Sequence, residues 1–261
     1  MIEVVGLPAF NDNYIWLLRE SGKAVVVDPG DAAPVLRHLA ITGDTLTAIL
    51  LTHHHGDHIG GVEELVLRCA VPPVVYGPAT EDIPSITHPL GGGEHICPAG
   101  LNTEFQVLAV PGHTRGHLAY YGPAIGEGAL FCGDTLFGAG CGRLFEGTPA
   151  QMHASLTAIA VLPTPTLVYC AHEYTQANLR FALTIEPNNQ DIQARIADVT
   201  ACRDQNLPTV PGSLKLELAT NPFLRTSHAT VIEKAKELLG HPPGSDTEVF
   251  AAIRQARNDF R

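Results

Sequence analysis

Residues 52–61 read THHHGDHIGG, and four histidines and one aspartate fall between positions 53 and 58. The apolar run TAILL (47–51) comes before this stretch and predicts a buried strand, while GGVEELVLRCA (60–70) follows and predicts a helix. Imidazole nitrogens and carboxylate oxygens are natural ligands of zinc, iron and manganese. The stretch therefore predicts a metal site at the carboxyl end of a strand.

The spacing inside this stretch allows a second ion beside the first. His53 and His55 are two residues apart, so in extended backbone their rings point to the same side and can bind one ion. His54 points to the opposite side, where a packing or supporting role is expected. Asp57 and His58 lie where the chain turns into the next helix, and they can face a second ion beside the first.

Three further apolar runs also end in a residue of ligand type. FQVLAVPGHT ends at His113, ALFCGD at Asp134 and TLVYCAHEYT at His172. Because the carboxyl ends of buried strands meet at one edge of a sheet, we expect these side chains to converge. Asp28, in VVVDPG, also ends a strand and could accept a ring N–H from a ligand histidine, with a simple turn residue as the alternative.

The pattern along the chain changes near residue 173. Before it, short apolar strands alternate with turns and a few helices, one of them over 148–162 with Thr148 as N-cap. After it, helical patterns dominate, at 174–184, 188–205, 227–239 and 246–260. We therefore expect a β-rich α/β domain over 1–172, which carries the metal site, and a helical domain over 173–261.

The composition limits the class of protein. The chain has 261 residues, 45% of them hydrophobic, and a formal net charge of −11. Nucleic acid is a poor ligand for such a chain, because phosphate binding needs clustered Lys and Arg. No apolar run reaches the ~18 residues of a membrane span, and the start MIEVVGLPAF lacks the layout of a secretory signal. We expect a cytoplasmic protein, without membrane association, whose six cysteines form no structural disulfides.

Several motifs together resemble one protein family. THHHGDH is similar to the HxHxDH signature of the metallo-β-lactamase superfamily. Within that superfamily the chain resembles glyoxalase II, the hydroxyacylglutathione hydrolases, over nearly its whole length. GCGRLFEGT, AHEYT and the helical tail with NPFLR point to this family rather than to the superfamily alone. The other similar stretches are FNDNYIWLL, VVDPG, GHTRGH, FCGDTLF and EPNN.

The resemblance implies a four-layer αββα sandwich with two divalent metal ions, zinc first, with iron or manganese as alternatives. The implied ligands are His53, His55 and His113 for the first ion, Asp57, His58 and His172 for the second, and Asp134 between both. A hydroxide shared by the ions would attack the thioester carbonyl, since paired ions lower the pKa of a shared water. Asp57, His58 and Asp134 would thus be catalytic through the metals, and Asp28 would support a ligand.

The resemblance also implies a binding site for glutathione. Arg143 stands where lysine is common, and Phe145 where tyrosine is common, so a hydroxyl contact is missing there. Tyr174 matches a tyrosine that contacts glutathione, with a core aromatic residue as the alternative. Arg254 and Arg257 lie on one face of the last helix and match a basic pair that binds the glycine carboxylate. Taken without the family, two such arginines would be solvated surface charges.

The expected function is hydrolysis of S-(2-hydroxyacyl)glutathione, typically S-lactoylglutathione, to glutathione and a 2-hydroxy acid such as D-lactate. This is the second step of methylglyoxal detoxification, carried out by a monomer on a small-molecule substrate. Three alternatives stay open: a persulfide dioxygenase with one iron, a nuclease of the same superfamily, and a non-catalytic metal- or glutathione-binding module. The charge of −11 counts against the nuclease, and a set of seven ligands counts against the module, because structural zinc sites are closed by four.

Overall fold

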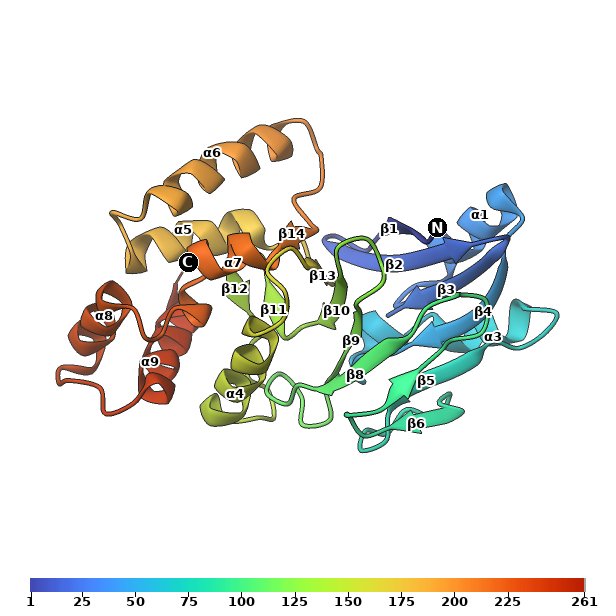
Figure 1. Ribbon diagram of the computed structural model, residues 1–261, viewed down its shortest axis with the longest axis horizontal. Helices are drawn as coiled ribbons and strands as arrows, with labels where there is room; N and C mark the ends of the chain where they lie inside the picture. The colour runs from blue at the N-terminus through green and yellow to red at the C-terminus, as the bar shows by residue number, and fades with distance from the viewer. Residues whose placement is uncertain (261) are drawn as a thin grey trace. The chain divides into compact units, whose positions relative to one another are not determined.

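The computed structural model describes residues 1–260, which divide into two compact units (Figure 1). The first unit consists of Met1–Ala109 and Arg115–Gly133, and the second consists of Val110–Thr114 and the chain from Asp134 onward. Among the residues that are described, no helix is both long enough and apolar enough to cross a membrane.

The first unit contains a six-stranded sheet whose strands follow chain order. The first three strands are antiparallel, and the third to sixth are parallel. The helices α1 (Ala32–Thr42) and α3 (Val62–Arg68) make the crossovers that parallel pairing requires. The strands are β1 (Glu3–Ala9), β2 (Asn13–Glu20), β3 (Lys23–Val27), β4 (Thr45–Leu50), β5 (Val74–Pro78) and β6 (His88–Leu90).

Both faces of the central strands are buried. One face packs with α1 and α3 in a cluster that includes Leu17, Val26 and Ile49. Their neighbours in sequence point to the other face and are equally buried. On that side an antiparallel set of strands follows, and the Tyr120 hydroxyl donates to the Leu51 carbonyl at 2.7 Å. These strands are β7 (His95–Ile96), β8 (Phe105–Ala109), β9 (Leu118–Gly122) and β10 (Ala129–Gly133).

The second unit is mainly helical. It begins with the short hairpin of β11 (Leu136–Phe137) and β12 (Gly140–Cys141), and β13 (Leu167–Cys170) pairs with β14 (Gly212–Ser213). Thr148 and Gln151 form the capping box that starts α4, as the sequence predicts. The helices are α4 (Pro149–Ala160), α5 (Thr175–Ile185), α6 (Gln190–Asp204), α7 (Leu214–Thr220), the 3₁₀ helix η1 (Pro222–Leu224), α8 (Ala229–Leu239) and α9 (Asp246–Asp259).

The structure corrects the predicted elements at a few places. The helix expected over 60–70 is present as α3, but a separate short helix that was not predicted, α2 (Gly56–Ile59), precedes it and contains Asp57 and His58. α7 was not predicted; it starts where the Ser213 side chain accepts from the Leu216 backbone N–H at 3.2 Å. The stretch between the helices predicted over 188–205 and 227–239 also contains β14 and η1.

Candidate functional site

The end of β4 and the start of α2 bring four predicted metal ligands together in the first unit. His53 and His58 are almost fully buried, at 0% and 1% exposure, while His55 is half-buried. His53 Nε2 lies 3.0 Å from His55 Nδ1, and the His53 and His58 rings are 4.1 Å apart at their centroids. Asp57 Oδ2 lies 3.6 Å from His58 Nε2. The donor atoms of these four side chains thus form one compact group.

Asp28 orients two of these histidines from the end of β3. Its Oδ2 accepts from His58 Nδ1 at 3.0 Å and from the Thr52 hydroxyl at 2.7 Å. Thr52 Oγ1 in turn lies 3.0 Å from His53 Nδ1. Because the Thr52 hydroxyl donates to Asp28, its oxygen accepts a hydrogen bond from the His53 N–H. An imidazole that donates through Nδ1 presents Nε2 to a metal, the usual arrangement of ligating histidines. The contact expected of Asp28 is therefore present, and its effect on a bound ion stays a prediction.

Two further histidines, His54 and His117, lie beside this group, and both have defined contacts. His54 Nδ1 bonds Glu81 Oε2 at 2.9 Å, and Glu81 Oε1 accepts from the Gly116 backbone N–H at 3.0 Å. His117 is fully buried and its ring stacks on His53 at 4.6 Å. These contacts agree with the supporting role expected of His54. Sequence reasoning did not identify Glu81, because its position becomes meaningful only when the loop after β5 lies beside the histidine stretch.

The second unit gathers the other three predicted ligands. His113 Nε2 lies 3.4 Å from Asp134 Oδ2, and His172 Nε2 lies 3.3 Å from Asp134 Oδ1. All three are buried, and Asp134 thus lies between the two imidazoles. His113 Nδ1 donates to the Arg143 carbonyl at 2.8 Å, which again presents Nε2. A Cβ at Gly142 would overlap the Asp134 carbonyl oxygen, so only glycine allows this close approach.

The donor chemistry of both groups fits a metal. The histidine and aspartate side chains that could hold an ion are those predicted from the sequence, four in the first unit and three in the second. Neutral imidazoles whose second nitrogen is hydrogen-bonded, together with carboxylates, are ligands typical of zinc and of other first-row divalent ions. The clusters therefore suggest a metal site.

A cavity of about 200 Å³ in the second unit collects most of the residues predicted to bind substrate. All three charged residues of its lining are arginines, namely Arg143, Arg254 and Arg257. Guanidinium groups bind carboxylates with charge-assisted, often bidentate, hydrogen bonds. The cavity is therefore suited to an anionic ligand. The other lining residues are Phe137, Cys141, Tyr174, Asn178 and Asn258.

Arg254 and Arg257 differ in how they are held, although the sequence predicts them as a pair. Arg254 is only 7% exposed; its Nη1 donates to the Cys141 carbonyl at 2.9 Å and its Nη2 to Asn258 Oδ1 at 3.1 Å. Its alternative interpretation as a solvated surface charge is wrong. Arg257 is half-buried and contacts Asn178 Oδ1 through Nη2 at 3.3 Å. Burial, and then the charge of Arg254, lower the pKa of Arg257. Both arginines line the cavity, but Arg254 is held by the loop at Cys141, whereas Arg257 is the more exposed of the two.

Asn178 is a cavity residue that sequence reasoning missed. It is buried in α5, and its Nδ2 donates to the Gly138 carbonyl at 3.0 Å while its Oδ1 accepts from Arg257. Asn178 follows Tyr174 by four residues, so the two share a helix face, and this spacing could have identified it.

Phe145 lies outside the cavity lining. Its side chain is 61% exposed, and its ring lies 5.2 Å from the His113 ring and 5.8 Å from the guanidinium of Arg143. Tyr174, by contrast, lines the cavity. The structure therefore brings four of the five predicted substrate residues together and places Phe145 beside His113, a predicted metal ligand.

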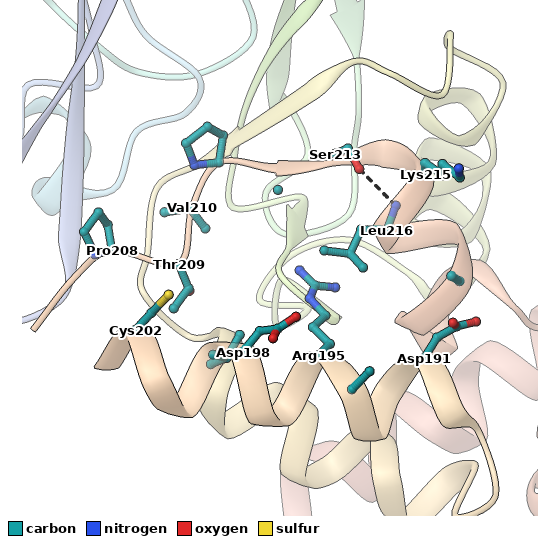
Figure 2. A pocket seen from close by; sticks show the side chains of 15 residues that line it. Asp191, Arg195, Asp198, Cys202, Pro208, Thr209, Val210, Ser213, Lys215 and Leu216 are labelled. Atoms are coloured by element: carbon teal, nitrogen blue, oxygen red, sulfur yellow. Dashed lines mark hydrogen bonds between the residues drawn. The ribbon is translucent and has the colours of Figure 1, made fainter. Parts of the chain in front are cut away.

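A larger cavity of about 540 Å³ lies elsewhere in the second unit, between α6 and residues 208–216 (Figure 2). Arg195 extends from α6 into it, but its guanidinium binds Glu217 Oε1 at 2.5 Å and Thr220 Oγ1 at 2.6 Å. This ion pair is buried and joins α6 to α7. Charge rather than size therefore makes the smaller cavity the candidate for an anionic ligand, because the lining of the larger one also contains Asp191 and Asp198.

Comparisons with known proteins give consistent matches. Residues 9–172 match the metallo-beta-lactamase superfamily, and residues 173–260 match the hydroxyacylglutathione hydrolase C-terminus. The hydroxyacylglutathione hydrolase of Dechloromonas aromatica is 57% identical over 273 residues, and that of Ectopseudomonas mendocina is 53% identical over 263 residues; both pairs of chains are covered completely.

Solved structures give the same fold. The crystal structure of ETHE1 from Myxococcus xanthus aligns with a TM-score of 0.65 at 24% identity, covering 100% of both chains. TTHA1623 in a di-iron-bound form aligns with a TM-score of 0.59 at 28% identity, covering 85% of this chain and 100% of its own. These likenesses confirm the predicted fold class, an α/β fold with two sheets followed by a helical C-terminal part.

Proposed function

The chain belongs to the hydroxyacylglutathione hydrolases of the metallo-β-lactamase superfamily, and on that premise we propose that it hydrolyses S-(2-hydroxyacyl)glutathione. The substrate is S-lactoylglutathione, and the products are glutathione and the 2-hydroxy acid. The observation that carries the proposal is the position of Tyr174, which lines the arginine cavity while its ring stacks on the ligand histidine His172. A carboxylate-binding cavity thus adjoins a metal-ligand group.

The proposed metal content is two divalent ions per chain, with zinc as the first choice and iron or manganese also compatible with the donors. The proposed ligands are His53, His55 and His113 for one ion, Asp57, His58 and His172 for the other, and Asp134 for both. Support comes from the hydrogen bonds that Nδ1 of His53, His58 and His113 makes, because each leaves Nε2 as the ligating nitrogen.

When bound, two such ions supply a water of lowered pKa and a Lewis acid for the thioester carbonyl. The residues of the chain bind and orient the substrate. Arg143 and Arg257 bind carboxylates of glutathione, and Tyr174 holds the peptide over His172. Arg254 donates a hydrogen bond to the backbone carbonyl of Cys141 and so holds this loop in place, which keeps Arg143 at the cavity wall.

Cys141 lines the same cavity, and its chemistry supports attack by water rather than by a thiol. Burial raises the pKa of the Cys141 thiol, and the nearby Arg254 opposes this rise without overcoming it. A thiol that stays protonated near neutral pH is a poor nucleophile. A covalent acyl–cysteine route is therefore disfavoured.

The proposed division of labour places the metal-binding domain at 1–172 and the substrate-binding helical domain at 173–261. The two family models that match the chain meet between residues 172 and 173, which supports this boundary. Arg143 precedes the boundary, so the glutathione site takes residues from both sides of it.

One assay tests the function. The purified chain, loaded with zinc, is mixed with S-lactoylglutathione, and the released glutathione is measured with a thiol reagent, with and without a chelator. We expect hydrolysis that stops after chelation and returns when zinc is restored, at close to two ions per chain. A β-lactam and an RNA serve as substrate controls. A zinc-loaded chain without thioesterase activity contradicts the proposal, as does a one-iron protein that consumes oxygen with glutathione persulfide.

A further inference from the structure

Asp57 is the most exposed of the four ligand-type side chains that the first unit contributes. Its side chain is 42% exposed, whereas His53 and His58 are fully enclosed. Packing holds a buried imidazole in one orientation, but a partly solvated carboxylate can rotate, and fixing it costs conformational entropy. Asp57 therefore needs a specific contact if it is to be held ready for an ion.

Asn13 makes such a contact. It is the first residue of β2, it is 8% exposed, and its Nδ2 donates to Asp57 Oδ2 at 3.0 Å. The accepting oxygen is the one that lies 3.6 Å from His58 Nε2. The hydrogen bond thus holds the carboxylate on the side of the next ligand. The sheet ladder fixes Asn13 itself, since it pairs with Ala9 across β1 and β2.

The turn that precedes Asn13 packs closely against the same ligand. Phe10 has a φ of 51°, a conformation that costs a bulky residue roughly 1–3 kcal/mol. A Cβ at Gly30 would overlap the Asp57 carbonyl oxygen and would lie 3.0 Å from the Phe10 ring. The turn at 10–13, Gly30 and Asp57 are therefore in mutual contact. The FNDN motif, which the proposed function leaves without a task, contributes this turn.

We propose that Asn13 is a positioning residue for the metal ligand Asp57. It acts through a neutral amide donor, which holds one carboxylate oxygen without adding charge to the site. The inference rests on the proposed function, because it takes Asp57 as a ligand of the second ion. Hydrogen-bond partners of metal ligands typically contribute about 10–100-fold to metal affinity. We expect this effect on the ion bound by Asp57 and His58 only, since the side-chain amide of Asn13 donates to Asp57 and, within residues 1–260, makes no hydrogen bond to His53 or His55.

The test measures metal release rather than activity. The zinc-loaded full-length chain is titrated with a chelator, and the release of each ion is followed with a zinc indicator. Asn13→Leu keeps the branched shape of the side chain and removes the donor, and Asn13→Ala removes both. Asn11→Ala is the matched control, because Asn11 lies in the same turn and is exposed. In both Asn13 variants one ion should be lost at about 10-fold or more lower chelator concentration, with the other ion unchanged. Asn11→Ala should behave as the wild type does.

Asp57→Ala completes a double-mutant cycle. If Asn13 acts through Asp57, Asn13→Leu has no further effect on metal release once Asp57 is alanine. The thermal midpoint of the metal-free protein should also be the same for Asn13→Leu and Asn11→Ala, which separates positioning from a general loss of stability.

Three results would overturn the inference: unchanged release in both Asn13 variants, an equal weakening of both ions, or an undiminished effect of Asn13→Leu in the Asp57→Ala background. A wild-type chain that binds two ions while the Asn13 variants behave normally overturns the role of Asn13 alone. If Asp57→Ala releases both ions at the same chelator concentration as the wild type, both this inference and the proposed ligand set are overturned.

Discussion

The phenol ring of Tyr174 lies parallel to the imidazole of His172, with ring centroids 4.8 Å apart and an interplanar angle of 4°. His172 is a predicted metal ligand whose Nε2 lies 3.3 Å from Asp134 Oδ1, and Tyr174 lines the cavity with three arginines. The two residues are separated in sequence only by Glu173. The carboxylate of Glu173 accepts a hydrogen bond from the Thr209 backbone N–H at 2.8 Å. The stack therefore connects the predicted metal ligands to the proposed substrate cavity through a short segment whose middle residue is held by a hydrogen bond.

Tyr174→Phe separates the two roles of this ring. The stack on His172 should survive, whereas any hydrogen bond from the phenol to glutathione is lost. A neutral hydrogen bond contributes about 0.5–1.5 kcal/mol, so we expect KM to rise roughly 2- to 10-fold with kcat and metal content unchanged. Steady-state kinetics with S-lactoylglutathione check this. An unchanged KM would assign Tyr174 to packing alone.

Arg257→Ala and Arg254→Ala should differ, although both remove a guanidinium from one cavity. Arg257 makes two long hydrogen bonds to Asn178, and its guanidinium lies 5.8 Å from the Phe181 ring and 5.9 Å from the Phe260 ring. Its loss should raise KM about 10-fold or more, as expected for a charge-assisted hydrogen bond, and should lower the thermal midpoint less than the loss of Arg254 does. Arg254 is buried and bound to the Cys141 carbonyl, so its loss should also destabilise the protein by about 1–3 kcal/mol.

The thermal midpoint and the KM of both arginine variants, measured together, distinguish the structural role from the binding role. Arg68→Ala is the control, because that arginine lies on α3 with an exposed i,i+4 partner, Glu64. Equal stability of the Arg254 and Arg257 variants would contradict the structural role of Arg254. An unchanged KM in Arg257→Ala would remove it from the binding site.

Asp134→Ala should abolish hydrolysis. Asp134 lies within 3.4 Å of His113 and 3.3 Å of His172, and under the proposed ligand set it serves both ions. A bound ion contributes several kcal/mol to the transition state, so the loss should be roughly 10³-fold or more. Metal analysis of the dialysed variant should show fewer than two ions. Asp198→Ala, exposed on α6, is the control. Near-normal turnover in Asp134→Ala would exclude its role between the ions.

Glu186 predicts how stability responds to acid. Burial acts to raise the pKa of Glu186, but hydrogen bonds from Arg225 and Thr230 outweigh it and hold the pKa below the ordinary value of 4.5. A carboxyl group with a lowered pKa in the folded state stabilises the fold above its unfolded pKa, and this contribution is lost as the pH falls through the folded pKa. We therefore expect the stability supplied by Glu186 to be complete at pH 7 and to decline below about pH 4.5.

Urea unfolding of the wild type and of Glu186→Gln, over a pH series, measures this contribution. The difference in free energy of unfolding should be largest at pH 7 and should shrink toward pH 3. Glu237→Gln is the control, since its carboxylate is 60% exposed beside Lys234. A difference that stays constant with pH would show that Glu186 acts through packing rather than through its charge.

The order of elements and the ligand types follow from local patterns. Apolar runs that end in His53, His113 or His172 predict strands that end in residues of metal-ligand type. This is possible because the pattern of apolar residues and the turn residues that bound a strand lie within about ten residues of one another. The start of α4 is predicted by Thr148 and Pro149 for the same reason. Short strands such as β12 and β14, two residues each, leave no such pattern, since tertiary contacts alone make them pair.

The amino-acid sequence by itself determined the metal-ligand types, the family and the succession of a β-rich part and a helical part. Only the tertiary structure decided that Arg254 is a buried support while Arg257 faces the cavity, that Phe145 lies outside the cavity lining, and that Asn13 and Asn178 hold functional side chains. The physical reason is sequence separation. Asn13 meets Asp57 across 44 positions and Arg254 meets Cys141 across 113, and no local periodicity specifies contacts over such distances.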